Sequence, residues 1–180
     1  MSVDADPVEL ALGRLSELGD AVRRDVALGP MTTYRVGGAA ALFVSVSDRG
    51  QLAVVADAAR ASGLPVLVVG RGSNMLVADS GFPGLAIGLA DLDTDIDIDV
   101  ATARVTASSG VALPVLARKT ASAGLSGFEW AVGVPGSIGG AVRMNAGGHG
   151  SDMAASLVEV TVFDLVDGVE RIVPVEELGL

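Results

Sequence analysis

The five residues at positions 70–74 combine groups that proteins use to bind phosphate. They read Gly-Arg-Gly-Ser-Asn and follow the apolar run Val66–Val69, which predicts a tight turn after a strand buried on both faces. Two glycines permit positive φ and a close approach of the backbone to a ligand. Ser73 and Asn74 add a hydroxyl and an amide beside the backbone N–H groups of the turn. The turn is therefore expected to bind phosphate.

A second glycine-rich stretch, residues 133–150, contains seven glycines together with Arg143 and His149. One such loop alone is consistent with an ordinary turn. Two such loops in a chain of this size predict two walls of one binding site. We expect its ligand to be long, phosphorylated and partly apolar.

The composition narrows the classes of ligand and of site. The chain has 180 residues, half of them apolar, and a net charge of −10 without a basic cluster, which argues against nucleic acid and anionic membranes as partners. Lys119 is the sole lysine, so backbone dipoles and a few arginines must bind any phosphate. The absence of cysteine excludes disulfides and thiolate metal sites. No signal peptide or membrane span is recognisable, so we expect a cytoplasmic location.

The first half of the chain predicts a helix at 6–18, a strand at 41–46, a helix at 48–62 and a strand at 65–69. Asp6 and Pro7 mark the start of the first helix. The strand-helix-strand unit predicts parallel strands. No helix pattern follows the turn at Gly70, and Met75 stands where a dinucleotide-binding fingerprint needs its third glycine, so we disfavour a Rossmann site. No lysine follows the glycines as in a Walker loop.

The second half predicts a strand at 85–89, a hairpin from 93–100 to 104–107, a helix at 112–123 and a hairpin from 157–165 to 169–175. Asp95, Asp97 and Asp99 alternate with apolar residues that include Val100. A calcium loop counted through these residues lacks an acid at its twelfth position. We therefore expect the carboxylates on the solvated face of a strand, the apolar residues facing a core, and no metal site.

Three motifs in order resemble one enzyme family. They are Thr-Thr-Tyr-Arg-Val-Gly-Gly at 32–38, Val-Gly-Arg-Gly-Ser-Asn-Met-Leu at 69–76, and Gly-Val-Pro-Gly-Ser-Ile-Gly-Gly at 133–140 with Met-Asn-Ala-Gly at 144–147. From about Thr32 onward the chain resembles the UDP-N-acetylenolpyruvoylglucosamine reductases. These enzymes use NADPH and a tightly bound FAD to reduce UDP-N-acetylglucosamine enolpyruvate to UDP-N-acetylmuramate in peptidoglycan synthesis.

The resemblance implies an α+β fold, the FAD-binding fold of the PCMH/vanillyl-alcohol-oxidase type with two α+β subdomains. We expect an N-terminal helix and lead-in at 1–30 and an FAD-binding domain at 31–180, divided at about residue 90 into 31–90 and 91–180. The family's catalytic arginine, serine and glutamate belong to segments that we expect beyond residue 180. We therefore predict no catalytic residue here and no complete reaction by these residues alone.

The resemblance also implies that the Gly70 turn holds the FAD pyrophosphate and that the Gly133 loop lies along the flavin and ribose. The FAD-contacting residues carried over from the family are Tyr34, Arg35, Gly37, Gly70, Arg71, Gly72, Ser73, Asn74, Pro135, Gly136, Ser137, Gly139 and Asn145. The implied partners are NADPH and a UDP-sugar substrate. The implied role is that of a monomeric cytoplasmic oxidoreductase in cell-wall biogenesis, and hence in cell shape and division.

Several alternatives stay open at this point. The glycine loops report phosphate binding, so a nucleotide-binding module without redox activity, or a flavin oxidase of the same wider fold, fits them too. Residues 28–38 form either a linker or a ligand-facing segment. Arg143 faces the flavin or the substrate phosphates, or it pairs with a surface carboxylate. For His149 we favour an exposed loop residue over a covalent flavin attachment site.

Overall fold

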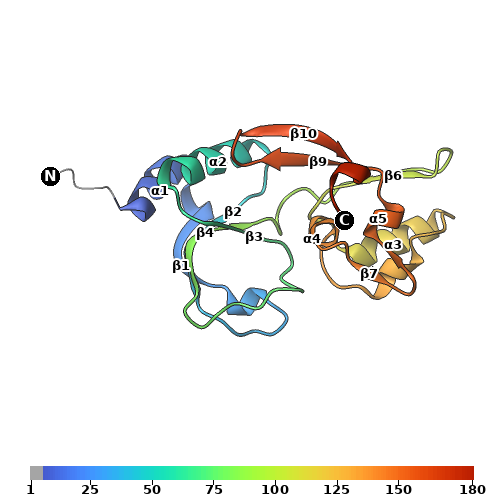
Figure 1. Cartoon of the computed structure of the whole chain (residues 1–180), viewed down its shortest axis with the longest axis horizontal. Coiled ribbons are helices and arrows are strands. Elements are labelled where there is room, and N and C mark those ends of the chain that lie inside the picture. The colour runs from blue at the N-terminus through green and yellow to red at the C-terminus, as the bar shows by residue number, and fades with distance from the viewer. Residues whose placement is uncertain (1–5) are drawn as a thin grey trace. The chain divides into compact units, whose positions relative to one another are not determined.

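The computed structural model describes residues 6–180, which divide into two compact units (Figure 1). The first unit extends to Asp91 and includes Phe163–Arg171. The second comprises Leu92–Val162 and Ile172–Leu180. Each unit carries one of the two glycine-rich loops.

The first unit is built on a four-stranded sheet of order β1-β2-β4-β3. Its strands are β1 (Val22–Ala27), β2 (Ala39–Ser45), β3 (Val66–Val69) and β4 (Phe82–Gly88). Strands β2, β4 and β3 are parallel, as predicted, and β4 lies between the other two. Central strands β2 and β4 supply the fully buried Leu42, Val44, Leu85 and Ile87.

Strand β3 is an edge strand, and the prediction that it is buried on both faces is wrong. Val68 exposes 52% of its surface. A four-residue apolar run does not distinguish a central strand from an edge strand. The longer strand β4, whose residues 84–88 are all buried, takes the central position instead.

Helices α1 (Pro7–Leu15) and α2 (Gly50–Ser62) pack against each other in the first unit. The predicted start of α1 is confirmed, because the Asp6 carboxylate accepts a hydrogen bond from the Val8 N–H at 3.0 Å and Pro7 occupies the first turn. Arg14 joins the two helices through an ion pair with Asp57 at 2.9 Å. Both helices precede the Gly70 turn in the sequence, and α2 connects β2 to β3, the strand that ends at this turn.

Strand β1 is absent from the sequence-based prediction, which treated residues 19–30 as a lead-in. It pairs antiparallel with β2, for example Val22 with Val44 and Ala27 with Ala39. The intervening residues Arg23, Arg24 and Asp25 are all exposed, and Asp25 has a φ of +51°. Charged residues are common on edge strands, where they block further pairing, but they conceal the apolar alternation that reveals a strand.

The second unit begins with the hairpin β5 (Ile96–Asp99) and β6 (Arg104–Ala107). Asp95, Asp97 and Asp99 are exposed as predicted, but Val100 is 57% exposed in the turn, where we expected it to face a core. Asp99 caps this turn by accepting hydrogen bonds from the Thr102 hydroxyl, at 2.7 Å, and from the N–H groups of Ala101 and Thr102. The Thr102 hydroxyl is the main reason that the pKa of Asp99 lies below its ordinary value.

The remaining elements of the second unit are short. They are α3 (Leu113–Ser122), a 3₁₀ turn (Glu129–Gly133), α4 (Ile138–Arg143), β7 (Gly147–Gly148), β8 (Ser151–Asp152) and α5 (Met153–Ser156). They enclose a core that includes Val111, Leu113, Trp130, Ile138 and Met153. This core fixes both ends of the second glycine loop.

A final hairpin joins β9 (Glu159–Asp164) and β10 (Val169–Pro174), which confirms the turn predicted at Asp167 and Gly168. The Asp164 carboxylate accepts hydrogen bonds from the N–H groups of Val166, at 2.7 Å, and Asp167. These two bonds, first that from Val166, and the nearby Arg171 lower the pKa of Asp164. The turn of this hairpin belongs to the first unit, and within that unit Arg60 Nη1 of α2 donates to the Val166 carbonyl at 3.1 Å.

Candidate functional site

In the first unit, residues 28–38 lie against residues 70–81, and we call these two segments the loop pair. The Thr33 N–H donates to the Gly72 carbonyl at 3.3 Å, and the Gly38 N–H donates to the Ala78 carbonyl at 2.9 Å. Residues 28–38, which connect β1 to β2, are therefore held against the Gly70 turn. The loop pair places Tyr34, Arg35 and Gly37, which the family resemblance suggested, on a segment bonded to the Gly70 turn.

Glycines bring the two backbones of the loop pair into direct contact. A Cβ added at Gly72, where φ is +65°, would lie 2.0 Å from the Met31 carbonyl oxygen. At Gly37 the added atom would lie 2.5 Å from Val77 Cβ. The expectation that Gly72 is small to admit a ligand needs correction, because the space beside it is filled by residues 31–32.

Two further glycines of the loop pair escaped the sequence analysis. A Cβ at Gly38 would lie 2.4 Å from the Asp79 carbonyl oxygen, and one at Gly81 would lie 2.1 Å from the Ala39 carbonyl oxygen. The Gly-Gly sequence at the end of the first motif was the signal that could have revealed Gly38. Sequence reasoning also overlooked Thr32, whose side chain is buried under the same loop.

The loop pair presents unpaired hydrogen-bond donors and cations. Within the described part of the first unit, the N–H groups of Gly70, Arg71, Gly72 and Asn74 donate to no backbone acceptor. Arg35 and Arg71 are exposed and form no ion pair with any residue of 6–180. Backbone N–H groups without a backbone acceptor, on segments that also carry exposed arginines, can bind an anion such as a pyrophosphate.

The second glycine loop is fixed at its centre by backbone bonds to the segment before α3. The Leu113 N–H donates to the Gly136 carbonyl at 3.0 Å, and the Ile138 N–H donates to the Val111 carbonyl at 2.9 Å. Gly136 has a φ of +127°. The Gly136 and Ser137 N–H groups donate to no backbone acceptor among the described residues of this unit, so they are available to a ligand.

Two residues expected to contact FAD have structural partners inside the second unit. The buried Ser137 side chain caps α4 by accepting from the Gly140 N–H at 3.4 Å. The Gly139 N–H donates to the Ser109 carbonyl at 2.9 Å, and a Cβ at Gly139 would lie 2.9 Å from Ser109 Cβ. Both residues thus shape the loop through its own contacts.

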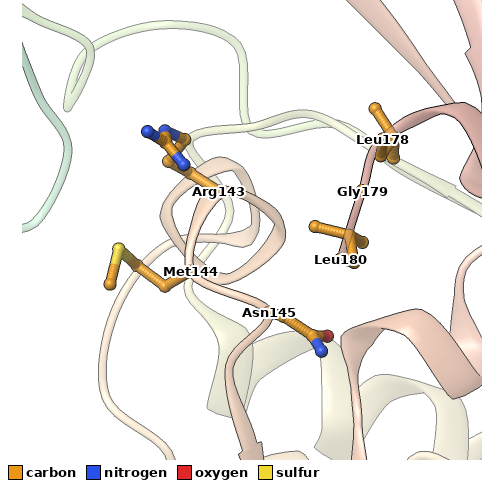
Figure 2. A pocket seen from close by; sticks show the side chains of 6 residues that line it. All are labelled: Arg143, Met144, Asn145, Leu178, Gly179 and Leu180. Atoms are coloured by element: carbon orange, nitrogen blue, oxygen red, sulfur yellow. The ribbon is translucent and has the colours of Figure 1, made fainter.

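Asn145 also makes a structural bond. Its Oδ1 accepts from the Ala154 N–H at 2.9 Å, while its backbone has a φ of +41°. It lines an open hollow of about 430 Å³ with Arg143, Met144 and residues 178–180. Figure 2 shows the Arg143 and Met144 side chains on one side of this hollow and Leu178 and Leu180 on the other.

Arg143 is exposed and forms no ion pair within residues 6–180. The alternative in which it pairs with a surface carboxylate is therefore not found in the structure. Together with Arg35 and Arg71 it belongs to the arginines whose charge is available to a ligand. The exposed Arg14, Arg24, Arg49, Arg60 and Arg171 have carboxylate partners, whereas Arg104 and Arg118, which lie outside both loops, are exposed and likewise form no ion pair within residues 6–180.

Asn145 both bonds the Ala154 N–H and lines the hollow, which gives a testable prediction. Asn145→Ala removes the acceptor for the Ala154 N–H and should lower the free energy of unfolding by about 1 kcal/mol. Asn145→Asp keeps that acceptor but removes the amide NH₂ donor, so its stability should stay near that of the parent chain. Denaturant unfolding measures both variants. Equal losses in the two would show that the bond to Ala154 contributes nothing.

His149 occupies an exposed turn, as predicted. His149 and Gly150 connect β7 to β8 with φ values of +53° and +86°, the signs that a two-residue type I′ hairpin turn requires. Within residues 6–180 no group of three or more His, Cys, Asp or Glu side chains could hold a metal ion. None of the helices in the same range has the length and apolar character needed to cross a membrane.

Comparison with known proteins shows the family of this chain. The family model described as "FAD binding domain" matches residues 40–172, about three quarters of the chain. The chain belongs to the FAD-binding domain family. Both glycine-rich loops of this FAD-binding domain, residues 70–74 and 133–150, lie within the matched region.

The relatives of this FAD-binding domain include reductases. The UDP-N-acetylenolpyruvoylglucosamine reductase of Synechococcus sp. (strain RCC307) is 43% identical over 157 residues, covering 87% of this chain and 51% of the relative. That of Rubrobacter xylanophilus is 41% identical over 169 residues, covering 93% of this chain and 55% of the relative. The chain thus spans about half the length of these relatives.

Solved structures agree on the fold of this FAD-binding domain. The UDP-N-acetylenolpyruvylglucosamine reductase of Thermus caldophilus aligns with a TM-score of 0.72 and 37% identity, covering 88% of this chain and 55% of that one. The 4-ethylphenol oxidase of Gulosibacter chungangensis aligns with a TM-score of 0.67 and 17% identity, covering 95% and 35%. The predicted fold class, an α+β FAD-binding fold of the PCMH/vanillyl-alcohol-oxidase type, is confirmed.

Proposed function

We propose that this chain is the FAD-binding part of an NADPH-dependent reductase that converts UDP-N-acetylglucosamine enolpyruvate to UDP-N-acetylmuramate. The observation that carries the proposal is the loop pair, where the N–H groups of Gly70, Arg71, Gly72 and Asn74 donate to no backbone acceptor and the exposed Arg35 and Arg71 form no ion pair within residues 6–180. Identity of about 40% to several reductases of that name supports the choice of reaction.

The roles of individual residues follow from their available groups. The N–H groups of Gly70, Arg71, Gly72 and Asn74 would bind the pyrophosphate, with Arg35 and Arg71 neutralising its charge. The N–H groups of Gly136 and Ser137 would bind a second polar part of the cofactor. FAD, when bound, supplies acceptance and donation of the hydride.

The remaining predicted FAD contacts have a supporting role in this proposal. Gly37 keeps the loop pair closed, Ser137 and Gly139 hold the second loop, and Asn145 fixes the first turn of α5. For Tyr34, which is 64% exposed, we propose contact with an apolar part of the cofactor. For Ser73 in the Gly70 turn and Pro135 in the second glycine loop, we propose contact with FAD.

The biological setting belongs to the same proposal. The reductase reaction implies a UDP-sugar substrate and a place in peptidoglycan synthesis, and hence in cell-wall biogenesis, cell shape and cell division. We further propose that the protein acts as a monomer in the cytoplasm. The net charge of −10 without a basic cluster supports a small-molecule partner over nucleic acid. It also disfavours a partnership with anionic membranes.

Anaerobic reduction of the flavin-loaded protein tests the reaction class. Addition of NADPH should bleach the visible flavin band, whereas alkylphenols and alcohols, which flavin oxidases of this wider fold would use, should leave it unchanged. Because no catalytic residue is predicted among residues 1–180, the subsequent addition of UDP-N-acetylglucosamine enolpyruvate to the reduced protein is expected to give no UDP-N-acetylmuramate. Bleaching by a phenol or an alcohol but not by NADPH would contradict the proposal and favour an oxidase.

A further inference from the structure

One buried hydroxyl in the loop pair is not explained by the fold alone. Thr32 is 5% exposed, one of three buried polar side chains in the described chain together with Thr120 and Ser137. Thr120 donates to the Ala117 carbonyl of its own helix, and Ser137 caps α4. The Thr32 hydroxyl instead makes two hydrogen bonds inside the loop, one of them with the backbone N–H of Arg35.

The Thr32 hydroxyl closes a turn at both ends. It donates to the Gly29 carbonyl at 2.9 Å and accepts from the Arg35 N–H at 3.1 Å. The Gly29 carbonyl also accepts from the Thr32 N–H at 2.9 Å, and the Arg35 N–H also approaches the Thr32 carbonyl at 3.3 Å. The backbone of the turn can therefore form without the hydroxyl, so the extra bond acts chiefly on Arg35.

Arg35 needs such a bond because its backbone is strained. Its φ of +54° lies in the left-handed region that side-chain-bearing residues rarely adopt. The neighbouring Thr33 is fixed by its bond to the Gly72 carbonyl, and Met31 packs against Gly72. The Thr32 hydroxyl therefore holds Arg35 in a defined conformation on a segment clamped to the Gly70 turn.

We infer that Thr32 is a positioning residue, which holds the Arg35 guanidinium ready for the anionic part of the ligand bound at the Gly70 turn. Arg35 is exposed and forms no ion pair within residues 6–180, so its charge is free for that use. The inference rests on the proposed binding of FAD. It assigns to Thr32 an indirect effect on affinity that passes through Arg35.

A double-mutant cycle separates positioning from a purely structural role. The variants are Thr32→Val, which keeps the shape but loses the hydroxyl, Arg35→Met, and the two combined, with Thr32→Ser as the conservative control. FAD is titrated into each apoprotein, and quenching of flavin fluorescence gives the Kd. We expect Thr32→Val and Arg35→Met each to raise the Kd roughly tenfold, the size of one lost charged hydrogen bond, and Thr32→Ser to stay near the parent value.

The combined variant decides the inference. If Thr32 acts through Arg35, the Kd of the combined variant should be no higher than that of Arg35→Met alone. Thr32→Val and Arg35→Met should each also weaken the salt dependence of FAD binding. An equal effect of Thr32→Val in the parent chain and in the Arg35→Met variant would show a merely structural role and overturn the inference. No effect of Arg35→Met would overturn it too.

Failure of the proposed function gives a different result. In that case the parent chain itself would not bind FAD, whereas failure of the inference leaves parent binding intact. Thermal unfolding of each apoprotein accompanies the titrations, and Thr32→Ser retains the hydroxyl should the valine variant not fold. A serine variant that binds FAD as weakly as a folded Thr32→Val variant would also contradict a role for the hydroxyl.

Discussion

Gly72→Ala is expected to weaken FAD binding strongly and to destabilise the first unit. The new Cβ would lie 2.0 Å from the Met31 carbonyl oxygen, and alanine would also be strained at a φ of +65°. Left-handed strain costs about 1–2 kcal/mol and overpacking a further 1–3 kcal/mol, so the free energy of unfolding should fall by roughly 2–5 kcal/mol. Displacement of the turn should remove at least two charged hydrogen bonds and raise the Kd for FAD by about 10²-fold or more.

Gly63→Ala is the matched control for this variant. Gly63 has almost the same φ, +67°, but nothing lies within 4 Å of an added Cβ. Strain alone should therefore cost about 1–2 kcal/mol and leave FAD affinity unchanged. Chemical denaturation and FAD titration measure both variants. Similar results for Gly63→Ala and Gly72→Ala would show that contact with Met31 has no part in the site.

The second large effect is expected at Gly136 in the other loop. Its φ of +127° is outside the conformations that alanine adopts without strain, so Gly136→Ala should force the peptide to rotate. Rotation would redirect the free N–H groups of Gly136 and Ser137 and break the bond from the Leu113 N–H. We expect a loss of stability of about 1–3 kcal/mol and an FAD Kd raised by roughly 10²-fold.

Gly133→Ala serves as the control in the same loop. No atom lies within 4 Å of a Cβ added at Gly133, and its backbone is not in the left-handed region. FAD affinity and stability should both stay close to those of the parent chain. If Gly133→Ala and Gly136→Ala weaken FAD binding to the same extent, the conformation of Gly136 is not what matters.

The sequence predicted much of the binding region because its signals are local. The apolar run of β3, the glycines of the Gly70 turn and the capped start of α1 each lie within a few consecutive residues. Of the two glycines in that turn, which were expected to permit positive φ, Gly72 has a positive φ and Gly70 does not. Three ordered motifs then sufficed to indicate an FAD-binding fold.

Features that depend on distant partners could not be predicted in this way. The place of β3 at the sheet edge depends on β4, which is inserted between strands that are adjacent in sequence. Strand β1 is recognisable only through its pairing with β2. The partners of Gly72 and Asn145, namely Met31 and Ala154, lie outside the three motifs, Met31 directly before the first and Ala154 after the last.

The same limit applies to the purpose of a glycine or a polar side chain. A glycine-rich sequence indicates close approach but not whether the approaching atom belongs to a ligand or to the protein. Gly72 turned out to face the Met31 carbonyl, and Ser137 to cap α4. Distances to partners were needed to separate groups that shape the site from those left free for the cofactor.

The flavin content of the purified chain tests the central claim most directly. We predict that the protein binds FAD noncovalently in a ratio of one to one, shows the visible absorption of a bound flavin, and releases all of it into the supernatant on acid precipitation. Flavin retained in the pellet would point to covalent attachment, with His149 as the first candidate. A correctly folded protein that neither contains FAD nor binds it on titration would contradict the account.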